Sequence, residues 1–361
     1  MADGAKFAAR NVRPRTKRAQ NKIPAVKSIN LALQGGGAHG AFTWGVLDRL
    51  CQEPRISIEG ISATSAGAMN GAVFVSGLAK DGREGARAAL ENYWRLVAKA
   101  GELSPLKPGI FDKLFGFGSG DQSPAFVAFD LMTRIMSPYQ FNPLNLNPLR
   151  TVLEQSVDFN ALRSATCPVK LFLSATNVRT GKVKIFENAE ISADAVLASS
   201  CLPFLFQAIE IGGEAYWDGG YMGNPAIFPL IYGCKSSDVV IVHINPLERA
   251  KLPRTASEIM NRINEISFNS SLMREMRAVS FVTKLIDDGK LEDPQFSRML
   301  IHAIAADEIM GSLGVASKIS TDWDFLTRLR DAGSNSAETW ITQNFEKLGH
   351  SSSVDIGALY L

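Results

Sequence analysis

Two turns of small residues near the start of the chain carry the residue types that acyl-transfer chemistry requires. The first is Gly35-Gly36-Gly37-Ala38-His39-Gly40, and the second is Ala63-Thr64-Ser65-Ala66-Gly67. A glycine turn exposes backbone N–H groups that can stabilise a developing negative charge. A serine in a sharp turn between a strand and a helix presents its hydroxyl to solvent or substrate. The pair therefore predicts a nucleophile at Ser65 and an oxyanion hole at the glycine turn.

The glycine turn also matches a different kind of site. Gly35, Gly37 and Gly40 have the spacing of a dinucleotide-binding fingerprint, and Glu59 stands about 20 residues further on, where such sites place a ribose-binding acid. The chain then runs from Gly60 directly into the serine turn, and no hydride-transfer constellation follows. A Walker-type phosphate loop is excluded because no Gly-Lys-Ser/Thr follows the glycines. A dinucleotide-binding oxidoreductase therefore stays as the less favoured alternative.

A serine nucleophile needs a base, and the sequence offers two arrangements. A Ser–Asp dyad would use Asp218 of Asp218-Gly219-Gly220, a turn that follows a predicted strand. A Ser–His–Asp triad in the chain order of α/β-hydrolases would add His243 or His302. His243 interrupts an apolar strand, and His302 is predicted to lie in a helical stretch. The first setting is more typical of a core histidine, and the second has no special turn chemistry, but the residues by themselves leave both arrangements open.

Each of these residues also has a purely structural interpretation. Ser65 could simply cap the helix that follows it. Asp218 could bond its own backbone in an ordinary Asp-Gly turn. His39 could pack within the glycine turn or orient it. The agreement of three turns in one chain makes the catalytic interpretation of Ser65 and Asp218 the stronger one.

The elements around these turns alternate between strand and helix. Strands are predicted at 28–34, 56–61, 169–177, 183–186 and 239–244, a hairpin at 208–217, and helices at 41–50, 66–78, 83–99, 149–156 and 192–200. This order predicts an α/β fold with a mostly parallel central sheet flanked by helices. The chain from residue 255 onward is predicted to form a mostly helical C-terminal extension.

Composition divides the chain into three parts. Residues 1–27 carry eight Lys and Arg side chains against one acid, Asp3, and show no hydrophobic periodicity, which predicts a disordered basic tail. Residues 28–250 are predicted to form the catalytic domain, and 251–361 a mostly helical region packed on or beside it. The aromatic-rich, Gly- and Pro-rich insertion at 103–148 is typical of a lid over an apolar channel or of a loop folded onto the core.

The composition also limits the class of protein. With 46% hydrophobic and 20% charged residues and a formal net charge of +2, the chain is an ordinary globular protein. No CxxC pair occurs, so neither a zinc site nor a disulfide framework is predicted; the cysteines are Cys51, Cys167, Cys201 and Cys234. The uncharged window 60–79 is too polar for a membrane span, and no secretory signal follows the basic N-terminus. A cytoplasmic protein is expected.

The three turns, in this order, resemble the motifs of the patatin-like phospholipases, and the resemblance covers about residues 28–245. Secondary matches lie between and after them, at Ser174-Ala175-Thr176-Asn177, Ala198-Ser199-Ser200-Cys201-Leu202-Pro203 and Asn224-Pro225. Two departures stand out. His39 replaces the Arg or Lys usual in the first motif, and Ala63 replaces the first glycine of the serine turn.

The resemblance implies a serine acyl-ester hydrolase that acts on lipids, of phospholipase A or lysophospholipase type, with a Ser65–Asp218 dyad. It implies no cofactor and no metal. The expected partners are a lipid substrate and a membrane surface, with a peripheral location on the inner face of that membrane. The basic tail could contact anionic lipid; nucleic acid is not expected, and a homodimer is compatible with the sequence. The two departures leave an alternative, a catalytically weak lipid-binding or regulatory protein on the same scaffold.

Overall fold

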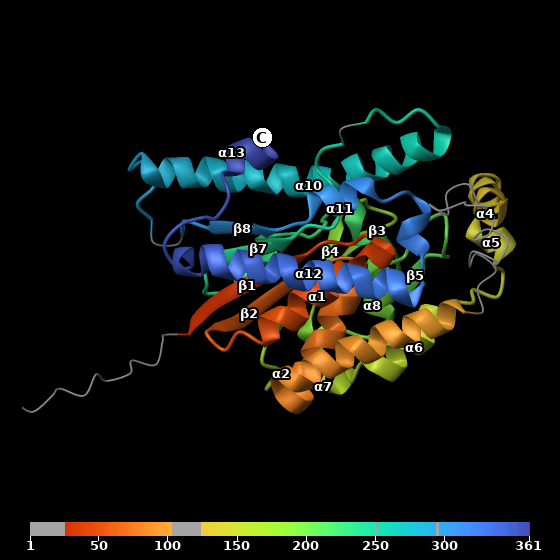
Figure 1. Ribbon diagram of the computed structural model, residues 1–361, viewed down its shortest axis with the longest axis horizontal. Helices are drawn as coiled ribbons and strands as arrows, with labels where there is room; N and C mark the ends of the chain where they lie inside the picture. Colours follow the sequence, from red (N-terminus) through yellow and green to blue (C-terminus); the bar gives the residue numbers. More distant parts are fainter. Residues whose placement is uncertain (1–25, 103–123, 250, 294–295) are drawn as a thin grey trace, which may run out of the picture.

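The protein is described by a computed structural model that covers residues 26–102, 124–249, 251–293 and 296–361 (Figure 1). The predicted tail at 1–27 lies almost wholly outside these residues. Residues 103–123 of the predicted lid lie outside them as well, so the structure describes only the second half of that insertion.

Within the described residues, eight strands form one sheet in the order β5-β6-β3-β2-β1-β7-β8, and β4 also pairs with β3. The pairs β1–β2, β1–β7, β2–β3 and β7–β8 are parallel, and the pairs that β4, β5 and β6 form are antiparallel. The predicted fold class, a mostly parallel sheet flanked by helices, is confirmed. The strands are β1 (Lys27–Leu33), β2 (Ile56–Ala63), β3 (Lys170–Asn177), β4 (Val183–Glu187), β5 (Ile209–Ile211), β6 (Glu214–Asp218), β7 (Asp238–Val242) and β8 (Leu300–Ile304).

Helices cover both faces of the sheet (Figure 1). The α-helices are α1 (Gly40–Cys51), α2 (Ala66–Gly101), α4 (Pro124–Ile135), α5 (Pro138–Phe141), α6 (Pro148–Ser156), α7 (Phe159–Arg163), α8 (Ala193–Ser199), α9 (Phe228–Gly233), α10 (Ala256–Asp287), α11 (Asp307–Ser312), α12 (Trp323–Asn344) and α13 (Ile356–Tyr360). Short 3₁₀ helices are η1 (Gly37–His39), η2 (Asn188–Glu190), η3 (Gly219–Tyr221), η4 (Ala316–Ile319) and η5 (Phe345–Lys347).

Alternate side chains of β7 point to opposite faces of the sheet, and each set packs against one of the two layers of helices. Val240 and Val242 belong to the apolar core shared with α1, α2 and α12. Val239 and Ile241 point to the other face and join the core that α9, α10 and α13 complete. Both faces of this central strand are buried, which explains its continuous apolar sequence.

The two helices expected at 66–78 and 83–99 are both present within α2, where a kink of non-helical backbone at Asp81 and Gly82 separates them. One element differs from the prediction. The stretch around His302 is strand β8, not helix, so the C-terminal region extends the sheet beside β7. A run of five mostly apolar residues fits a buried strand or a helix equally well from periodicity alone, and pairing with β7 decides between them.

None of the helices in the described residues combines the length and the apolar character needed to cross a bilayer. The four cysteines are free thiols.

The crossing of α1 and α12 depends on two glycines. A Cβ atom on Gly45 would lie 1.8 Å from the carbonyl oxygen of Arg330, and one on Gly333 would lie 2.0 Å from that of Phe42. The two backbones therefore approach too closely for any side chain between them. This contact attaches α12, from the C-terminal region, to the helix that follows the glycine turn.

We expect Gly45→Ala to lower the free energy of unfolding by about 2–3 kcal/mol, because the added methyl group forces the two helices apart. Urea denaturation measures the change. Gly311→Ala is the matched control, since no atom lies within 4 Å of the added Cβ in α11; it should be neutral or stabilise slightly. Equal stability of the two variants would contradict the tight crossing.

Candidate active site

The glycine turn and the serine turn meet at the carboxyl edge of the sheet. β1 and β2 are parallel neighbours, so the turns that follow them leave from the same edge. A Cβ atom on Gly35 would lie 2.4 Å from Cβ of Ser65, and one on Gly67 would lie 2.4 Å from the carbonyl oxygen of Leu33. Glycine at both positions is what allows the two turns to touch.

Ser65 has the backbone of a strained turn between strand and helix. Its φ of 56° and ψ of −122° are rarely adopted by a residue with a side chain. It occupies the N-cap position of α2, yet its side chain makes no capping hydrogen bond. Its N–H donates to Oγ of Ser199 at 3.0 Å, which fixes the turn. The capping interpretation therefore has no support, and the hydroxyl is left free for other chemistry.

In the glycine turn, one of the N–H groups expected to bind an oxyanion is already hydrogen-bonded within the protein. The N–H of Gly35 donates to Oδ1 of Asn224 at 2.7 Å, and the Gly35 carbonyl accepts from Nδ2 of Asn245 at 2.5 Å. Within the described residues, the N–H groups of Gly36 and Gly37 donate to no partner. The N–H groups of Gly36 and Gly37 are therefore available to an oxyanion, whereas the hydrogen bonds of Gly35 anchor the turn.

His39 is buried in the wall of this turn and is neutral. Burial, helped by the positive charge of Lys318, lowers the pKa of its imidazole to about 3. Nε2 lies 2.7 Å from Oγ of Ser317, and the ring packs against Phe325. His39 therefore does not supply the positive charge that the Arg or Lys usual in the family's first motif would carry at this position.

Asp218 ends β6 and is fully buried. Its backbone is held by Thr176, whose hydroxyl donates to its carbonyl at 2.8 Å, and by the carbonyl of Cys201, which accepts its N–H at 2.7 Å. Oδ1 accepts the N–H of Gly220 at 2.7 Å, as in an ordinary Asp-Gly turn. A Cβ on Gly219 would lie 2.1 Å from the carbonyl oxygen of Ser174, so this turn also needs glycine.

The second carboxylate oxygen of Asp218 has the properties of a base. Oδ2 has no hydrogen-bond partner among the described residues. Burial raises the pKa of Asp218 to about 7, while the Gly220 N–H and the nearby hydroxyl of Ser65 act to lower it. The Ser65 hydroxyl is close enough to affect the carboxylate, although no direct hydrogen bond of normal length joins them. Such bonds are often long before substrate is bound.

The histidines considered for a triad are engaged elsewhere. Nε2 of His243 lies 2.7 Å from the Tyr360 hydroxyl, and burial lowers the pKa of His243 to about 4. Nε2 of His302 lies 2.9 Å from Oδ1 of Asp238, at the opposite edge of the sheet. The structure brings neither histidine to Ser65.

Glu59, the ribose-binding acid of the dinucleotide hypothesis, is also in use elsewhere. Its carboxylate accepts the backbone N–H groups of Lys235 and Ser236 at 2.8 and 2.9 Å. It therefore holds the loop that leads into β7. Glu59 is therefore not available to bind a ribose, as the dinucleotide-binding hypothesis required.

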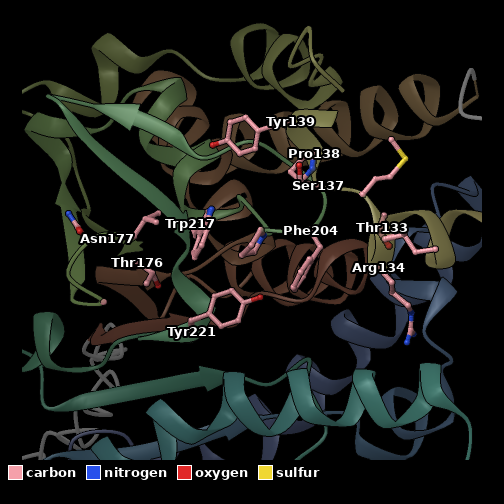
Figure 2. A pocket seen from close by; sticks show the side chains of 15 residues that line it. Thr133, Arg134, Ser137, Pro138, Tyr139, Thr176, Asn177, Phe204, Trp217 and Tyr221 are labelled. Atoms are coloured by element: carbon pink, nitrogen blue, oxygen red, sulfur yellow. The ribbon is translucent and has the colours of Figure 1, made fainter. Parts of the chain in front are cut away.

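A cavity of about 630 Å³ opens beside the Asp218 turn (Figure 2). Its wall includes Trp217 and Tyr221, the near neighbours of Asp218, together with Phe204 and residues 133–139 of the aromatic-rich insertion. Neither Ser65 nor Asp218 lines it directly. In Figure 2, Tyr221 lies on the side of α10, and its ring packs edge-on against Phe268 of that helix. The cavity is a predominantly apolar space beside the turn that carries Asp218.

Comparison with protein families gives the class. The family model for patatin-like phospholipase matches residues 31–231, which is more than half of the chain. The chain therefore belongs to the patatin-like phospholipase family, and this membership places it among the lipid acyl hydrolases. No significant match was found among curated proteins.

Solved structures with detectable similarity share little sequence with this chain. VipD from Legionella pneumophila is 15% identical, with 86% of this chain and 68% of that chain covered and a TM-score of 0.37. ExoU of the Pseudomonas aeruginosa type III secretion system, crystallised with SpcU, is 15% identical, with 87% and 53% covered and a TM-score of 0.32. In a second ExoU–SpcU structure the values are 16%, 88%, 52% and 0.35. This chain spans about half the length of ExoU.

Several residues that build the site were not assigned a role from sequence. Asn224 and Asn245 hold Gly35, and Ser199 holds the N–H of Ser65. Ser199 and Asn224 lie within secondary matches to the family pattern, so a signal for them existed. Asn245 follows the apolar strand β7 without any motif around it, and only its contact with the glycine turn reveals it.

Proposed function

We propose that the protein hydrolyses acyl esters of lipids, as a phospholipase A or lysophospholipase, through a dyad of Ser65 and Asp218. The observation that carries the proposal is the meeting of three groups at one edge of the sheet. These are a hydroxyl on a strained turn, a buried carboxylate with a raised pKa, and two backbone N–H groups; one oxygen of the carboxylate and both N–H groups have no partner in the part of the chain that the structure describes.

The reaction follows from these positions. Asp218 accepts the proton of Ser65 as Oγ attacks the ester carbonyl carbon. The N–H groups of Gly36 and Gly37 hold the oxyanion of the tetrahedral intermediate. The intermediate collapses to an acyl-enzyme, and Asp218 returns the proton to the departing alcohol or lysolipid. Water then attacks the acyl-enzyme, loses a proton to Asp218, and releases the fatty acid as Ser65 regains its hydrogen.

Ser65→Ala and Asp218→Asn should each abolish hydrolysis of a short p-nitrophenyl ester, because one removes the nucleophile and the other the base. The loss should exceed the 10²–10³-fold typical of one missing oxyanion donor. Steady-state kinetics, together with labelling of Ser65 by a fluorophosphonate, measure it. Circular dichroism verifies that each variant is folded.

The same assay separates the dyad from the triad. His243→Asn and His302→Asn should keep activity within a few-fold of the wild type, provided that they fold. A loss as complete as that of Ser65→Ala in either folded variant would favour a triad. A folded wild-type protein that neither hydrolyses esters nor reacts with the probe, yet binds lipid vesicles, would instead support the catalytically weak binding protein.

The raised pKa of Asp218 predicts a pH dependence. A base works only when deprotonated, so kcat/KM should be constant above about pH 7 and fall about tenfold per pH unit below it. A pH–rate profile between pH 5 and 9 on a non-ionising ester measures this. A profile that stays flat between pH 5 and 9 would show that no group with a pKa near 7 controls the reaction, and would contradict the raised pKa of Asp218.

The cavity mouth suggests where a membrane would meet the protein. Leu131 and Ile135 of α4, Phe204 in the cavity wall and Ile263 of α10 are large apolar side chains that are mostly exposed. In Figure 1 the first turns of α10 lie at the same end of the molecule as α4 and α5. Exposed apolar side chains at the end of the molecule where the apolar cavity opens, which we call the apolar rim, suit an enzyme that draws acyl chains from a lipid surface.

Ile263→Asp should weaken binding to phospholipid vesicles by about 10- to 100-fold, since one buried Ile side chain contributes about 1.5–3 kcal/mol. Turnover of a soluble ester should stay unchanged. The matched control is Phe281→Asp on the same helix, about 27 Å further along and similarly exposed. Vesicle co-sedimentation and size-exclusion chromatography are the measurements. Conversion of a dimer to a monomer with vesicle binding unchanged would assign this rim to a homodimer interface instead.

A further inference from the structure

A segment outside the family-matched residues reaches the glycine turn. η4 (Ala316–Ile319) lies in the C-terminal region, well beyond residue 231. Gly37 has a φ of +62°, and a Cβ atom on it would lie 2.2 Å from the backbone carbonyl oxygen of Lys318. The carbonyl of Lys318 therefore packs directly on Gly37, one of the two residues of the turn whose N–H has no partner among residues 26–102, 124–249, 251–293 and 296–361.

The neighbouring residue fixes the other side of the turn. Oγ of Ser317 donates to the carbonyl of Gly314 at 2.5 Å and so presents its lone pairs to Nε2 of His39 at 2.7 Å. His39 must therefore carry its proton on Nε2, and the buried Nδ1 has no partner among the described residues. The imidazole is held in one orientation and one tautomer by a residue 278 positions away in the chain.

Lys318 is in turn tied to α10. Its Nζ donates to Oδ1 of Asn261 at 2.9 Å and lies 3.4 Å from Oε1 of Glu265. Glu265 is almost fully buried and also accepts from Arg249 at 2.7 Å. Burial alone would raise the pKa of Glu265, but the hydrogen bond from Arg249 and the charge of Lys318 lower it. The carboxylate thus stays ionised and gives Lys318 a fixed anchor.

We propose that Ser317 and Lys318 are positioning residues for the oxyanion turn, so that the C-terminal region is a working part of the active site. Ser317 orients His39, and the Lys318 backbone, anchored through its side chain to Asn261 and Glu265, supports Gly37. The expected effect of these two residues on the rate of hydrolysis rests on the proposed hydrolase function. Their expected effect on the mobility of the glycine turn, which η4 holds in place, does not depend on that function.

The experiment compares Ser317→Ala and Lys318→Met with the wild-type full-length protein. Both variants should lower kcat for a p-nitrophenyl ester by about tenfold while KM stays within twofold, because the turn retains its donors but loses their alignment. Fluorophosphonate labelling of Ser65 should slow by the same factor. Ser317→Thr, which keeps the hydroxyl, should restore the rate. Ser312→Ala is the matched control, since within the described residues its hydroxyl bonds only to the Ile309 carbonyl in α11.

Hydrogen–deuterium exchange separates the failure of this proposal from failure of the proposed function. Peptides covering residues 35–42 should exchange faster in Ser317→Ala and Lys318→Met than in the wild type or Ser312→Ala, with the melting temperature changed by only a few degrees. Unchanged exchange in both variants, or unchanged kcat in an active protein, would overturn the positioning role. An inactive wild type with faster exchange in the variants would overturn only the hydrolase function.

Discussion

The close approach of two backbone turns is the constraint on which the site depends. A Cβ on Gly35 would fall 2.4 Å from Cβ of Ser65, so the glycine turn can lie against the serine turn only because no side chain intervenes. Parallel pairing of β1 and β2 brings both turns to one edge, and β6 delivers Asp218 there through its pairing with β3. The strained backbone of Ser65 is tolerated because the residues packed around it hold it in that conformation.

Burial gives the site its chemistry. A carboxylate in water has a pKa near 4 and is a weak base. The dry position of Asp218 brings its pKa to about 7, and contacts with Thr176 and Cys201 hold it there. The same burial has the opposite effect on the imidazoles, since it disfavours their charged forms. Burial thus makes the aspartate a better base and keeps the imidazoles of His39 and His243 neutral.

The C-terminal region is integrated into the fold to a degree that the family match does not indicate. It contributes β8 to the sheet, packs α12 on α1 through two glycines, and packs α10 under the Asp218 turn. η4 then reaches the glycine turn. We propose that residues 28–250 and 251–361 act as one structural unit, because the helix and the turn that follow β1 are both held from outside the family-matched residues.

The sequence by itself determined the order of the chemical parts: a glycine turn, a serine turn and an Asp-Gly turn, each placed by local patterns at the end of a strand. Local patterns suffice there because turn chemistry depends on neighbours in the chain. The tertiary structure alone decided that Gly35 donates to Asn224, 189 residues away, and that His39 rests on Ser317. It also decided that the stretch around His302 is a strand. Such contacts join residues whose local sequences carry no mutual signal, so only the packed fold reveals them.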